Sequence, residues 1–383
     1  MLTMLATALL GGQVFADVTG TGIQGATEIS DTKYYGKHTT DSSTATGGNV
    51  TVKEEATGEV PVKAVVYGGY ADKADVSNNT VTMQGGTVGT IYGGNGYTGA
   101  SNNKVTMQGG NVSDFIYGGN GGKEGNSCNN TVIMTGGSVR MLYGGSSGNN
   151  YTPSGNVVIV TGGSITGALM AGYNLGIGSQ NNKVHLVGKG ASNVTIADGQ
   201  GITSTYSYTG VDAGISLTNV FGGYATKTGI STDNSIDIYG TGIEISGMFA
   251  YMQVLTFNIT NDAVAALAPE VAVTLTSTSS GNALDLTGVD LQVKDLDVKE
   301  WTPGKTITLV QSTQAIQGLE DDKMVDITDA TGAKVAQGKL QLVNGTDGKH
   351  RLNLIVQGNV PEPTTGTLSL LALATLAARR RRK

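Results

Sequence analysis

The octapeptide Asn79-Thr80-Val81-Thr82-Met83-Gln84-Gly85-Gly86 decides the fold, because it is repeated along the chain. Further copies begin at Asn103, Asn130 and Asn156, with a looser one at Asn182, so successive asparagines are 24, 27, 26 and 26 residues apart. The next clear copy begins at Asn234, 52 residues further on, which predicts one intervening coil that has lost the signature. A fixed period of this length is typical of solenoid proteins.

Apolar and polar residues alternate with period two inside each copy, as in Val81 and Met83 or Val105 and Met107. This pattern predicts a β-strand with one buried face. Strands this short bury that face only by stacking on identical neighbours about 4.8 Å away. The sequence therefore predicts an all-β fold, a parallel β-helix or β-solenoid of about 25-residue coils, with about seven or eight coils between Tyr67 and Tyr251.

The asparagine that opens each copy is expected at a corner of the coil. Asparagine tolerates left-handed backbone angles there, and its amide can bond to the equivalent asparagine of the next coil. We therefore expect a structural asparagine ladder rather than a row of ligand-binding residues.

A second marker, Tyr-Gly-Gly, keeps the same period and begins at Tyr67, Tyr92, Tyr117 and Tyr143. We expect each Gly-Gly pair to turn the chain, since glycine reaches positive φ without steric cost. The strand that starts at Ser138 should then end at Tyr143. The tyrosines should stack in register, either filling a corner of the core or facing outward, where Tyr92, Tyr117 and Tyr143 would offer a platform for sugar faces.

The composition narrows the class of protein. Of 383 residues 59 are glycine and only 14% are charged, which fits turns between strands rather than helices. The formal net charge of -6, with no basic patch outside the C-terminal tail, argues against a nucleic-acid partner. Cys128 is the only cysteine, so the chain cannot form an intrachain disulfide.

Different segments flank the repeats. Residues 1–10 are apolar, and Val14-Phe15-Ala16 puts small or compact residues at the positions that a signal peptidase reads. This predicts a signal peptide of residues 1–16, cleaved after Ala16. Residues 17–63 are expected to cap the solenoid of residues 64–251, because an open end would expose a strand edge. Residues 252–357 keep alternating strands without Gly-Gly pairs, which predicts a smaller β-rich capping region.

Part of this C-terminal region carries a recognisable order. The turn Trp301-Thr302-Pro303-Gly304-Lys305 is followed by a strand at 307–310, the turn Ile316-Gln317-Gly318 and a strand at 351–356. Over about 60 residues this order resembles the region that closes autotransporter passenger β-helices. The resemblance implies a capped, autotransporter-like solenoid body, with Trp301 in its core.

The C-terminal tail combines three segments in an order that is typical of a signal for protein sorting. Pro361-Glu362-Pro363 precedes an apolar run at 366–378, and the chain closes with Arg379, Arg380, Arg381, Arg382 and Lys383. The prolines keep the motif out of a helix. The apolar run is about 13 residues long and spans about 20 Å as a helix, less than the ~30 Å core of a bilayer. It predicts a short transmembrane helix within 360–383, with its terminal cations on the cytoplasmic side.

This tail resembles the PEP-CTERM sorting signal of exported proteins in Gram-negative bacteria that make extracellular polysaccharide. The resemblance implies recognition by a membrane-embedded exosortase and cleavage near the motif. The protein would then reside transiently in the inner membrane before release or transfer to the cell surface or extracellular matrix. An ordinary single-span tail anchor is the alternative.

No residue set predicts catalysis, a metal site or a cofactor. The outward position of the first strand holds Thr82, Thr106, Ile133, Ile159, His185 and Asp237, which form no column of carboxylates. With a coil between them, His185 and Asp237 would lie about 10 Å apart, too far for an acid–base pair, and His185 is expected at the surface. His38 and His350 lie in opposite flanks and offer no zinc-ligand spacing.

Together these patterns predict an exported structural or adhesin-like protein rather than an enzyme. Its repetitive surface would contact extracellular polysaccharide, host glycan or cells through many weak sites. Two alternatives stay open. One is a glycan-binding module within 252–357, and the other is a polysaccharide-degrading β-helix enzyme, which would need a basic residue with two or more acids converging on one face.

Overall fold

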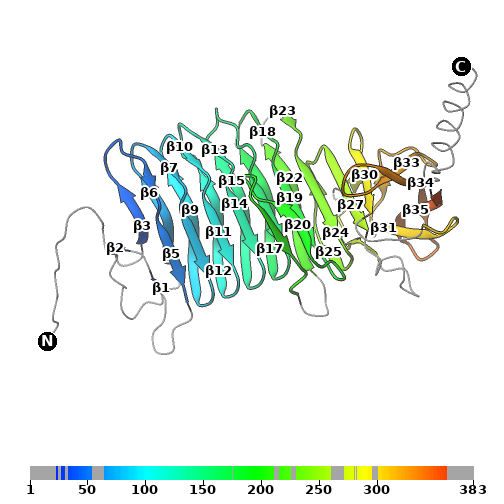
Figure 1. The fold of residues 1–383 in the computed structure, drawn as a ribbon, viewed down its shortest axis with the longest axis horizontal. Helices are drawn as coiled ribbons and strands as arrows, with labels where there is room; N and C mark the ends of the chain where they lie inside the picture. Colours follow the sequence, from blue (N-terminus) through cyan, green and yellow to red (C-terminus); the bar gives the residue numbers. More distant parts are fainter. Residues whose placement is uncertain are drawn as a thin grey trace, which may run out of the picture.

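The computed structural model describes residues 23–24, 27–30, 33–53, 64–174, 176–210, 215–225, 230–259, 271–279, 281, 283–295 and 301–359. Within these residues every regular secondary-structure element is a β-strand. Figure 1 shows the strands stacked side by side along one long axis. Most neighbouring strands of the main sheet are parallel, so the predicted β-solenoid is confirmed.

Each coil contributes strands to parallel columns that run along the rod. The first column contains the asparagine-led strands of the repeat and the strands that continue their row at both ends. They are β5 (Asn49–Val52), β8 (Thr80–Met83), β11 (Lys104–Met107), β14 (Thr131–Met134), β16 (Val157–Val160), β19 (Lys183–Val187), β24 (Ser235–Tyr239), β27 (Val254–Ile259), β30 (Asp290–Asp295) and β33 (Met324–Thr328).

The second column contains the strands that carry the Tyr-Gly-Gly marker and their equivalents. They are β3 (Lys33–Thr39), β6 (Val65–Ala71), β9 (Thr87–Gly96), β12 (Asn111–Asn120), β15 (Ser138–Ser147), β17 (Ser164–Asn174), β22 (Ile215–Ala225), β25 (Ile243–Ile245), β26 (Phe249–Ala250), β28 (Val273–Leu275) and β31 (Thr306–Ser312).

A third, narrower column lies at one corner of the coils. It contains β4 (Ala45–Thr46), β7 (Asp75–Ser77), β10 (Gly99–Ser101) and β13 (Asn126–Cys128), and Ser154 then bridges Cys128 to the pair β18 (Gly178–Gln180) and β23 (Ile230–Thr232).

Equivalent residues of successive coils lie directly above one another. Val81, Val105 and Val132 pair in register, and the row continues through Val158, Val184 and Ile236. All six side chains are fully buried in one continuous core. The period-two pattern thus places one face of every strand in the interior, as expected.

The 52-residue step holds no missing coil, so that prediction is wrong. β19 pairs directly with β24, and β17 pairs directly with β22. The additional residues include an antiparallel hairpin of β20 (Val194–Ala197) and β21 (Thr203–Tyr206). This hairpin packs on the outer side of the first column and covers the outward side chains of Ile133, Val157 and Ile159. Burying that apolar surface is a physical reason for an insertion that does not continue the coil.

The two kinds of Gly-Gly pair have different roles. In the octapeptides the second glycine, at Gly86, Gly110, Gly137 and Gly163, has a φ of 77–92°, so these pairs turn the chain as predicted. The Tyr-Gly-Gly glycines instead lie inside strands, and β15 continues past Tyr143 to Ser147, contrary to the prediction. Their small size is required because a Cβ on Gly119 would lie 2.4 Å from the Asn130 amide nitrogen.

The left-handed corner is one residue earlier than predicted. Asn78, Asn102, Asn129 and Asn181 have φ values of 51–57°. The residue after each of them is the asparagine that opens the repeat, and it does not have a positive φ. The Asn-Asn dipeptides of the repeat therefore divide two tasks between them, a tight corner and a buried hydrogen-bond ladder.

Antiparallel strands close both ends of the rod. β1 (Ile23–Gln24) pairs with β5 and β2 (Thr27–Ser30) pairs with β3 at the first end. At the other end β34 (Lys334–Asn344) and β35 (His350–Asn359) form a hairpin against β33 and β31. These pairings cover strand edges that would otherwise be open to association. Parallel pairing runs from β3 to β33, so the rod extends beyond the repeat region of residues 64–251 on both sides.

No helix within the described ranges is long and apolar enough to cross a membrane. The predicted transmembrane segment within 360–383 lies outside those ranges, as do the predicted signal peptide and its cleavage residue Ala16.

Candidate functional site

A stack of aromatic rings runs along the second column of strands. The ring centroids of consecutive tyrosines are 4.7–5.0 Å apart and their planes are within 4–11° of parallel. This separation equals the spacing between strands of a sheet, so the backbone register itself builds the stack. Met170 and Phe221 occupy the same position in the next two coils. We call this row the aromatic stripe, and it consists of Tyr35, Tyr67, Tyr92, Tyr117, Tyr143, Met170 and Phe221.

The aromatic stripe lies on the outer side of the solenoid. Ile91, Ile116 and Leu142 immediately precede three of its tyrosines and are fully buried in the core. Because neighbouring residues of a strand point to opposite faces, the tyrosines point away from the core. Tyr143, Met170 and Phe221 belong to an apolar cluster separate from it.

The tyrosine hydroxyls of the stripe remain protonated at physiological pH. Burial raises the pKa of Tyr67, Tyr92 and Tyr117, and it raises the pKa of Tyr143 to about 12. Each hydroxyl therefore serves as both a donor and an acceptor of hydrogen bonds.

The stack changes what these tyrosines can offer to a ligand. Sequence analysis predicted that Tyr92, Tyr117 and Tyr143 would form a platform for sugar faces, and the structure does bring them together. Their ring faces, however, are occupied by one another. Tyr35, Tyr67 and Tyr143 are also buried, so what the stripe presents outward is the ring edges and hydroxyl groups of Tyr92 and Tyr117. These groups favour hydrogen bonding over stacking.

Two further tyrosines place rings across the ends of the stripe, and sequence analysis missed both. The ring of Tyr70 is 5.3 Å from that of Tyr35 and 5.1 Å from that of Tyr67, at 70° and 73° to their planes. Tyr35 and Tyr67 stack on each other, so Tyr70 contacts the edges of these two rings. At these centroid distances the carbon atoms of the rings would overlap unless Tyr70 turns its own ring face toward those edges. Tyr251 is perpendicular to the ring of Tyr224, 5.0 Å away at 85°.

Tyr70 could have been found from the sequence, because tyrosine recurs at the same position of the coil repeat. It lies three residues after Tyr67, and Tyr173 and Tyr224 occupy the same position in later coils. The coils in between have Asn95, Asn120 and Ser146 there. Tyr251 has no equivalent in this row, so only the structure identifies it.

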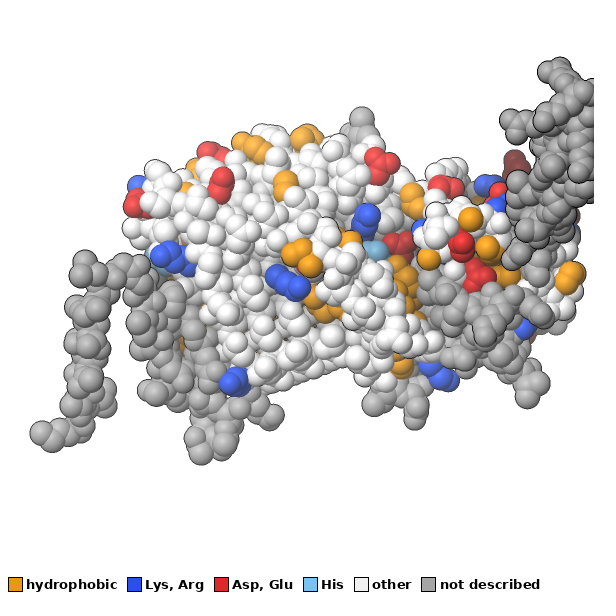
Figure 2. Space-filling model, in the orientation of Figure 1, with side chains coloured by type: hydrophobic (Ala, Val, Ile, Leu, Met, Phe, Trp, Pro, Cys, Tyr) orange, Lys and Arg blue, Asp and Glu red, His pale blue; other side chains and the backbone are white. Residues whose placement is uncertain are grey.

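The strands that carry the stripe beyond β3 are nearly free of charge, whereas β3 itself contains Lys33 and Lys37. β9, β12, β15, β17 and β22 contain two charged residues, Asp114 and Arg140, whose side chains lie 3.8 Å apart. The guanidinium of Arg140 also lies 4.6 Å from the ring centroid of Phe115. Figure 2, a view of one face of the rod, likewise shows only scattered charged side chains over the coils and a denser group toward the C-terminal end.

The asparagine ladder is confirmed and is completely buried. Asn79, Asn103, Asn130, Asn156, Asn182 and Asn234 each have 0% exposure. From each, the backbone N–H and the side-chain amide both donate to the Oδ1 atom of the next asparagine at 2.9–3.1 Å. Gln253 ends the row by accepting from Asn234. With no exposed surface, these amides cannot contact a ligand.

His185 and Asp237 form a pair that sequence analysis wrongly separated. Because β19 and β24 are adjacent, His185 Nδ1 lies 3.2 Å from Asp237 Oδ2, and it lies 3.3 Å from the hydroxyl of Tyr239. His185 is only 6% exposed rather than at the surface. Burial lowers its pKa to about 4, and the Asp237 carboxylate opposes that shift. A buried neutral imidazole beside a carboxylate is a structural polar contact rather than an open acid–base site.

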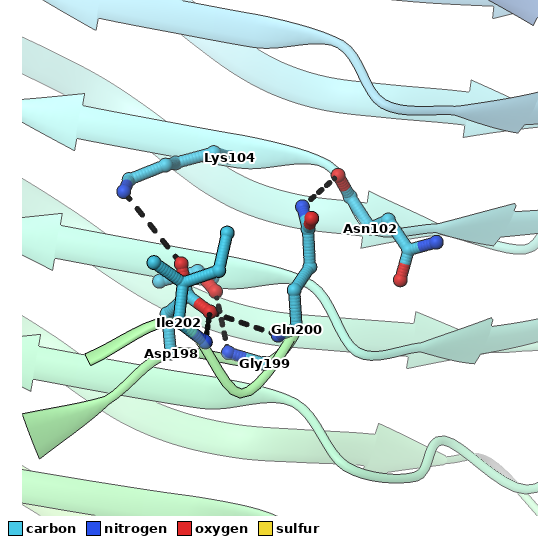
Figure 3. A network of polar contacts seen from close by, with 7 residues as sticks. Asn102, Lys104, Asp198, Gly199, Gln200 and Ile202 are labelled. Atoms are coloured by element: carbon cyan, nitrogen blue, oxygen red, sulfur yellow. Dashed lines mark hydrogen bonds and ion pairs between the residues drawn. The ribbon is translucent and has the colours of Figure 1, made fainter.

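The inserted hairpin is fastened to the first column by polar contacts. Figure 3 shows its tip lying across neighbouring strands. Gln200 donates from its side-chain amide to the carbonyl of Asn102 at 2.9 Å, and the carboxylate of Asp198 lies 3.7 Å from Lys104 Nζ. The backbone N–H of Gly199 donates to the hydroxyl of Thr131 at 2.9 Å. The hairpin is thus bonded to residues of two successive coils.

Other predicted residues have plain structural roles. Trp301 is 3% exposed and its indole N–H donates to Asp295 at 2.7 Å, so it is a core residue as expected. Cys128 is partly buried with its sulfur 3.3 Å from the hydroxyl of Ser154. His38 stacks on Tyr35 near the first end of the stripe. The described ranges contain no group of three or more His, Cys, Asp or Glu side chains placed to hold a metal ion.

Comparison with known families identifies the C-terminal tail. Residues 359–383 match the family described as the PEP-CTERM protein-sorting motif. This range includes the predicted sorting residues Pro361, Glu362, Pro363, Arg379, Arg380, Arg381 and Arg382, which lie outside the described residues.

The chain therefore carries a PEP-CTERM sorting motif, as the sequence predicted. The motif indicates an exported protein that is an exosortase substrate, with a cell-surface or extracellular destination. Neither the curated proteins nor the solved structures include a match to the chain. The resemblance of its body to autotransporter passengers stays a prediction.

Proposed function

We propose that this exosortase substrate is a structural, adhesin-like component of the cell surface or extracellular matrix, and that its rod presents a repetitive face to polysaccharide. The sorting motif at 359–383 carries the proposal, because it directs the chain to the compartment in which such a role is exercised. Transit through the inner membrane of a Gram-negative bacterium, with anchoring by the segment within 360–383, belongs to the same proposal.

The form of the body supports a scaffolding role. A single buried core runs through all the coils, and the antiparallel strands at both ends close the sheet edges. Such a rod is stiff along its axis because each coil is hydrogen-bonded to the next. Groups repeated along it contact a polymeric partner at several points, so weak contacts add through effective concentration.

The role we propose is one of binding and architecture, not catalysis. The polysaccharide-degrading alternative needs a basic residue and converging acids on an accessible face. The one histidine–carboxylate contact within the coils of the repeat, His185 with Asp237 at 3.2 Å, has a buried imidazole.

Processing and location of the chain in its native host test the proposal. We would fractionate cells and measure the intact mass of the mature protein, for the wild type and for a Pro361→Ala, Pro363→Ala double variant. Substitution of the neighbouring Thr364 and Thr365 by alanine provides the matched control. The wild type and the control should end near Pro361, lack the arginine tail and leave the membrane fraction, whereas the double variant should be retained there.

Two results would contradict this proposal. A full-length C-terminus in the wild type would make the tail a permanent membrane anchor. Identical processing of the double variant and the wild type would show that the Pro-Glu-Pro triplet is not what the processing enzyme reads.

A further inference from the structure

Tyr251 is held in an unfavourable backbone conformation that exposes its ring. Its φ is 57°, in the left-handed region that bulky side chains seldom adopt. Its side chain is 43% exposed, and it stands at 64° to the ring of Phe221 with centroids 5.3 Å apart. Such a conformation persists only where the surrounding structure imposes it, and it is concentrated at functional positions.

The backbone of Tyr251 explains how the conformation is held. Its carbonyl accepts a hydrogen bond from the N–H of Gly223 at 2.9 Å, which fixes the residue against β22. The neighbouring rings of Phe221 and Tyr224 then support the side chain from the coil before. The result is a supported, partly exposed aromatic ring at the C-terminal end of the aromatic stripe.

Tyr70 provides a second ring at the other end. It covers the edges of Tyr35 and Tyr67 with one face and is half-buried. Between the strand of Tyr70 and the strand before Tyr251 there are six steps from coil to coil, which at the spacing of a β-sheet is about 30 Å. Over this length Tyr92 and Tyr117 are partly exposed, whereas Tyr67, Tyr143, Met170 and Phe221 are buried. The hydroxyls that the stripe offers are therefore those of Tyr92 and Tyr117, near the middle of the face.

The charge and the hydrogen-bonding groups of the face between Tyr70 and Tyr251 indicate the class of polymer that it can bind. Along the coils between the two anchors its charges, on Asp114 and Arg140, lie 3.8 Å apart and neutralise one another. At the Tyr70 end Asp72 lies 3.6 Å from His38, whose ring contacts that of Tyr70. It has aromatic carbon for the apolar faces of sugar rings, and it has the tyrosine hydroxyls and the amides of Asn95 and Asn120 for sugar hydroxyls. The coil interval is also close to the length of one pyranose unit in an extended chain. Anionic polymers would find no compensating positive patch on it.

We propose that the face from Tyr70 to Tyr251 binds an uncharged polysaccharide chain lying along the rod, with these two rings as stacking anchors and the hydroxyls of Tyr92 and Tyr117 between them. This inference rests on the proposed surface role and names the partner class and the residues that contact it. Because contacts are spread over several coils, long chains bind far better than short oligosaccharides.

Affinity electrophoresis of the mature, processed protein tests the inference. Native gels would contain hydroxyethylcellulose or galactomannan as uncharged polymers, or carboxymethylcellulose, which has the same backbone as the first but carries negative charge. We expect retardation by an uncharged polymer and none by carboxymethylcellulose. Loss of one stacking ring should weaken the apparent affinity by about three- to tenfold.

The variants are chosen so that misfolding does not imitate lost binding. Tyr251→Gly removes the ring and relieves the left-handed backbone, so it should fold at least as well as the wild type. Tyr70→Asn installs the side chain that occupies this position in the next coil, as Asn95. Tyr97→Ala is the matched control, since Tyr97 is 39% exposed but bonds to Glu124 away from the stripe.

The inference is supported if Tyr251→Gly and Tyr70→Asn both lose retardation while Tyr97→Ala keeps it. Absence of retardation by both uncharged polymers, retardation by carboxymethylcellulose alone, or wild-type behaviour of Tyr251→Gly would each overturn it. A chain that is exported and processed but not retarded would leave the proposed location intact and remove only this binding site.

Discussion

Replacing Asn130 by alanine should strongly destabilise the solenoid. Asn130 is fully buried in the middle of the asparagine ladder. Its Oδ1 accepts from the backbone N–H and the side-chain amide of Asn103, both at 3.0 Å. Its own side-chain amide donates to the carbonyl of Ala100 at 3.0 Å and to Asn156 Oδ1 at 2.9 Å. Alanine removes all of these bonds without admitting water.

The size of the effect follows from the groups that are left without partners. The Asn103 N–H loses its partner in the dry interior, whereas Asn156 Oδ1 still accepts from the Asn130 backbone at 3.1 Å. The carbonyl of Ala100, a residue of the paired strand β10, loses its bond from the Asn130 amide. An unsatisfied buried polar group costs about 1–3 kcal/mol, and a lost hydrogen bond costs about 1 kcal/mol. Together they give a loss of about 3 kcal/mol in the free energy of unfolding, a large fraction of the stability of an ordinary domain.

Urea unfolding followed by circular dichroism would measure this loss, and hydrogen exchange at the Asn103 amide would locate it. The matched control is Asn120→Ala, because Asn120 is half-buried and makes only long side-chain bonds of 3.3 Å to Asn95 and Gly122. Water can replace those partners, so the control should lose less than about 1 kcal/mol. Equal losses for the two variants, or a loss below about 1 kcal/mol for Asn130→Ala, would refute the assignment of ladder asparagines as buried structural groups.

Three other substitutions test separate features. Gly119→Ala should destabilise by more than about 2 kcal/mol in urea unfolding, since its Cβ would lie 2.4 Å from the Asn130 amide nitrogen, whereas Gly281→Ala meets no atom closer than 3.9 Å and should be neutral. In the folded protein the pKa of His185 is lowered to about 4, below its unfolded value of about 6.5. As the pH falls, the unfolded state therefore binds a proton first. The free energy of unfolding should decrease by on the order of 3 kcal/mol between pH 6.5 and pH 4. His185→Gln should remove that part of the pH dependence, and an unchanged slope would contradict it. Ile196→Ala, at a side chain of the inserted hairpin that is 2% exposed, should cost about 2–4 kcal/mol locally and accelerate proteolysis of the hairpin relative to the coils.

The candidate site was predictable only in part. The tyrosine period places Tyr92, Tyr117 and Tyr143 at equal steps, and stacking in register follows because strand spacing and ring stacking distance agree. Because the rings stack on one another, their faces are not open to a sugar, and this consequence was recognised only from the positions of the rings in the structure. Tyr251 breaks the period, and its exposure depends on Phe221 and Tyr224 of the preceding coil, so no local pattern could mark it.

The sequence by itself determined the coil period, the inward face of each strand, the asparagine ladder and the sorting motif, because each depends on residues close together in the chain or on exact repetition. Only the tertiary structure decided which strands are neighbours. A step of 52 residues fits a coil that has lost the repeat signature and an inserted hairpin equally well. The direct pairing of β19 with β24 shows that the additional residues form an insertion and not a coil. The same pairing brings His185 to Asp237, because contact depends on which backbones share hydrogen bonds and not on distance along the chain.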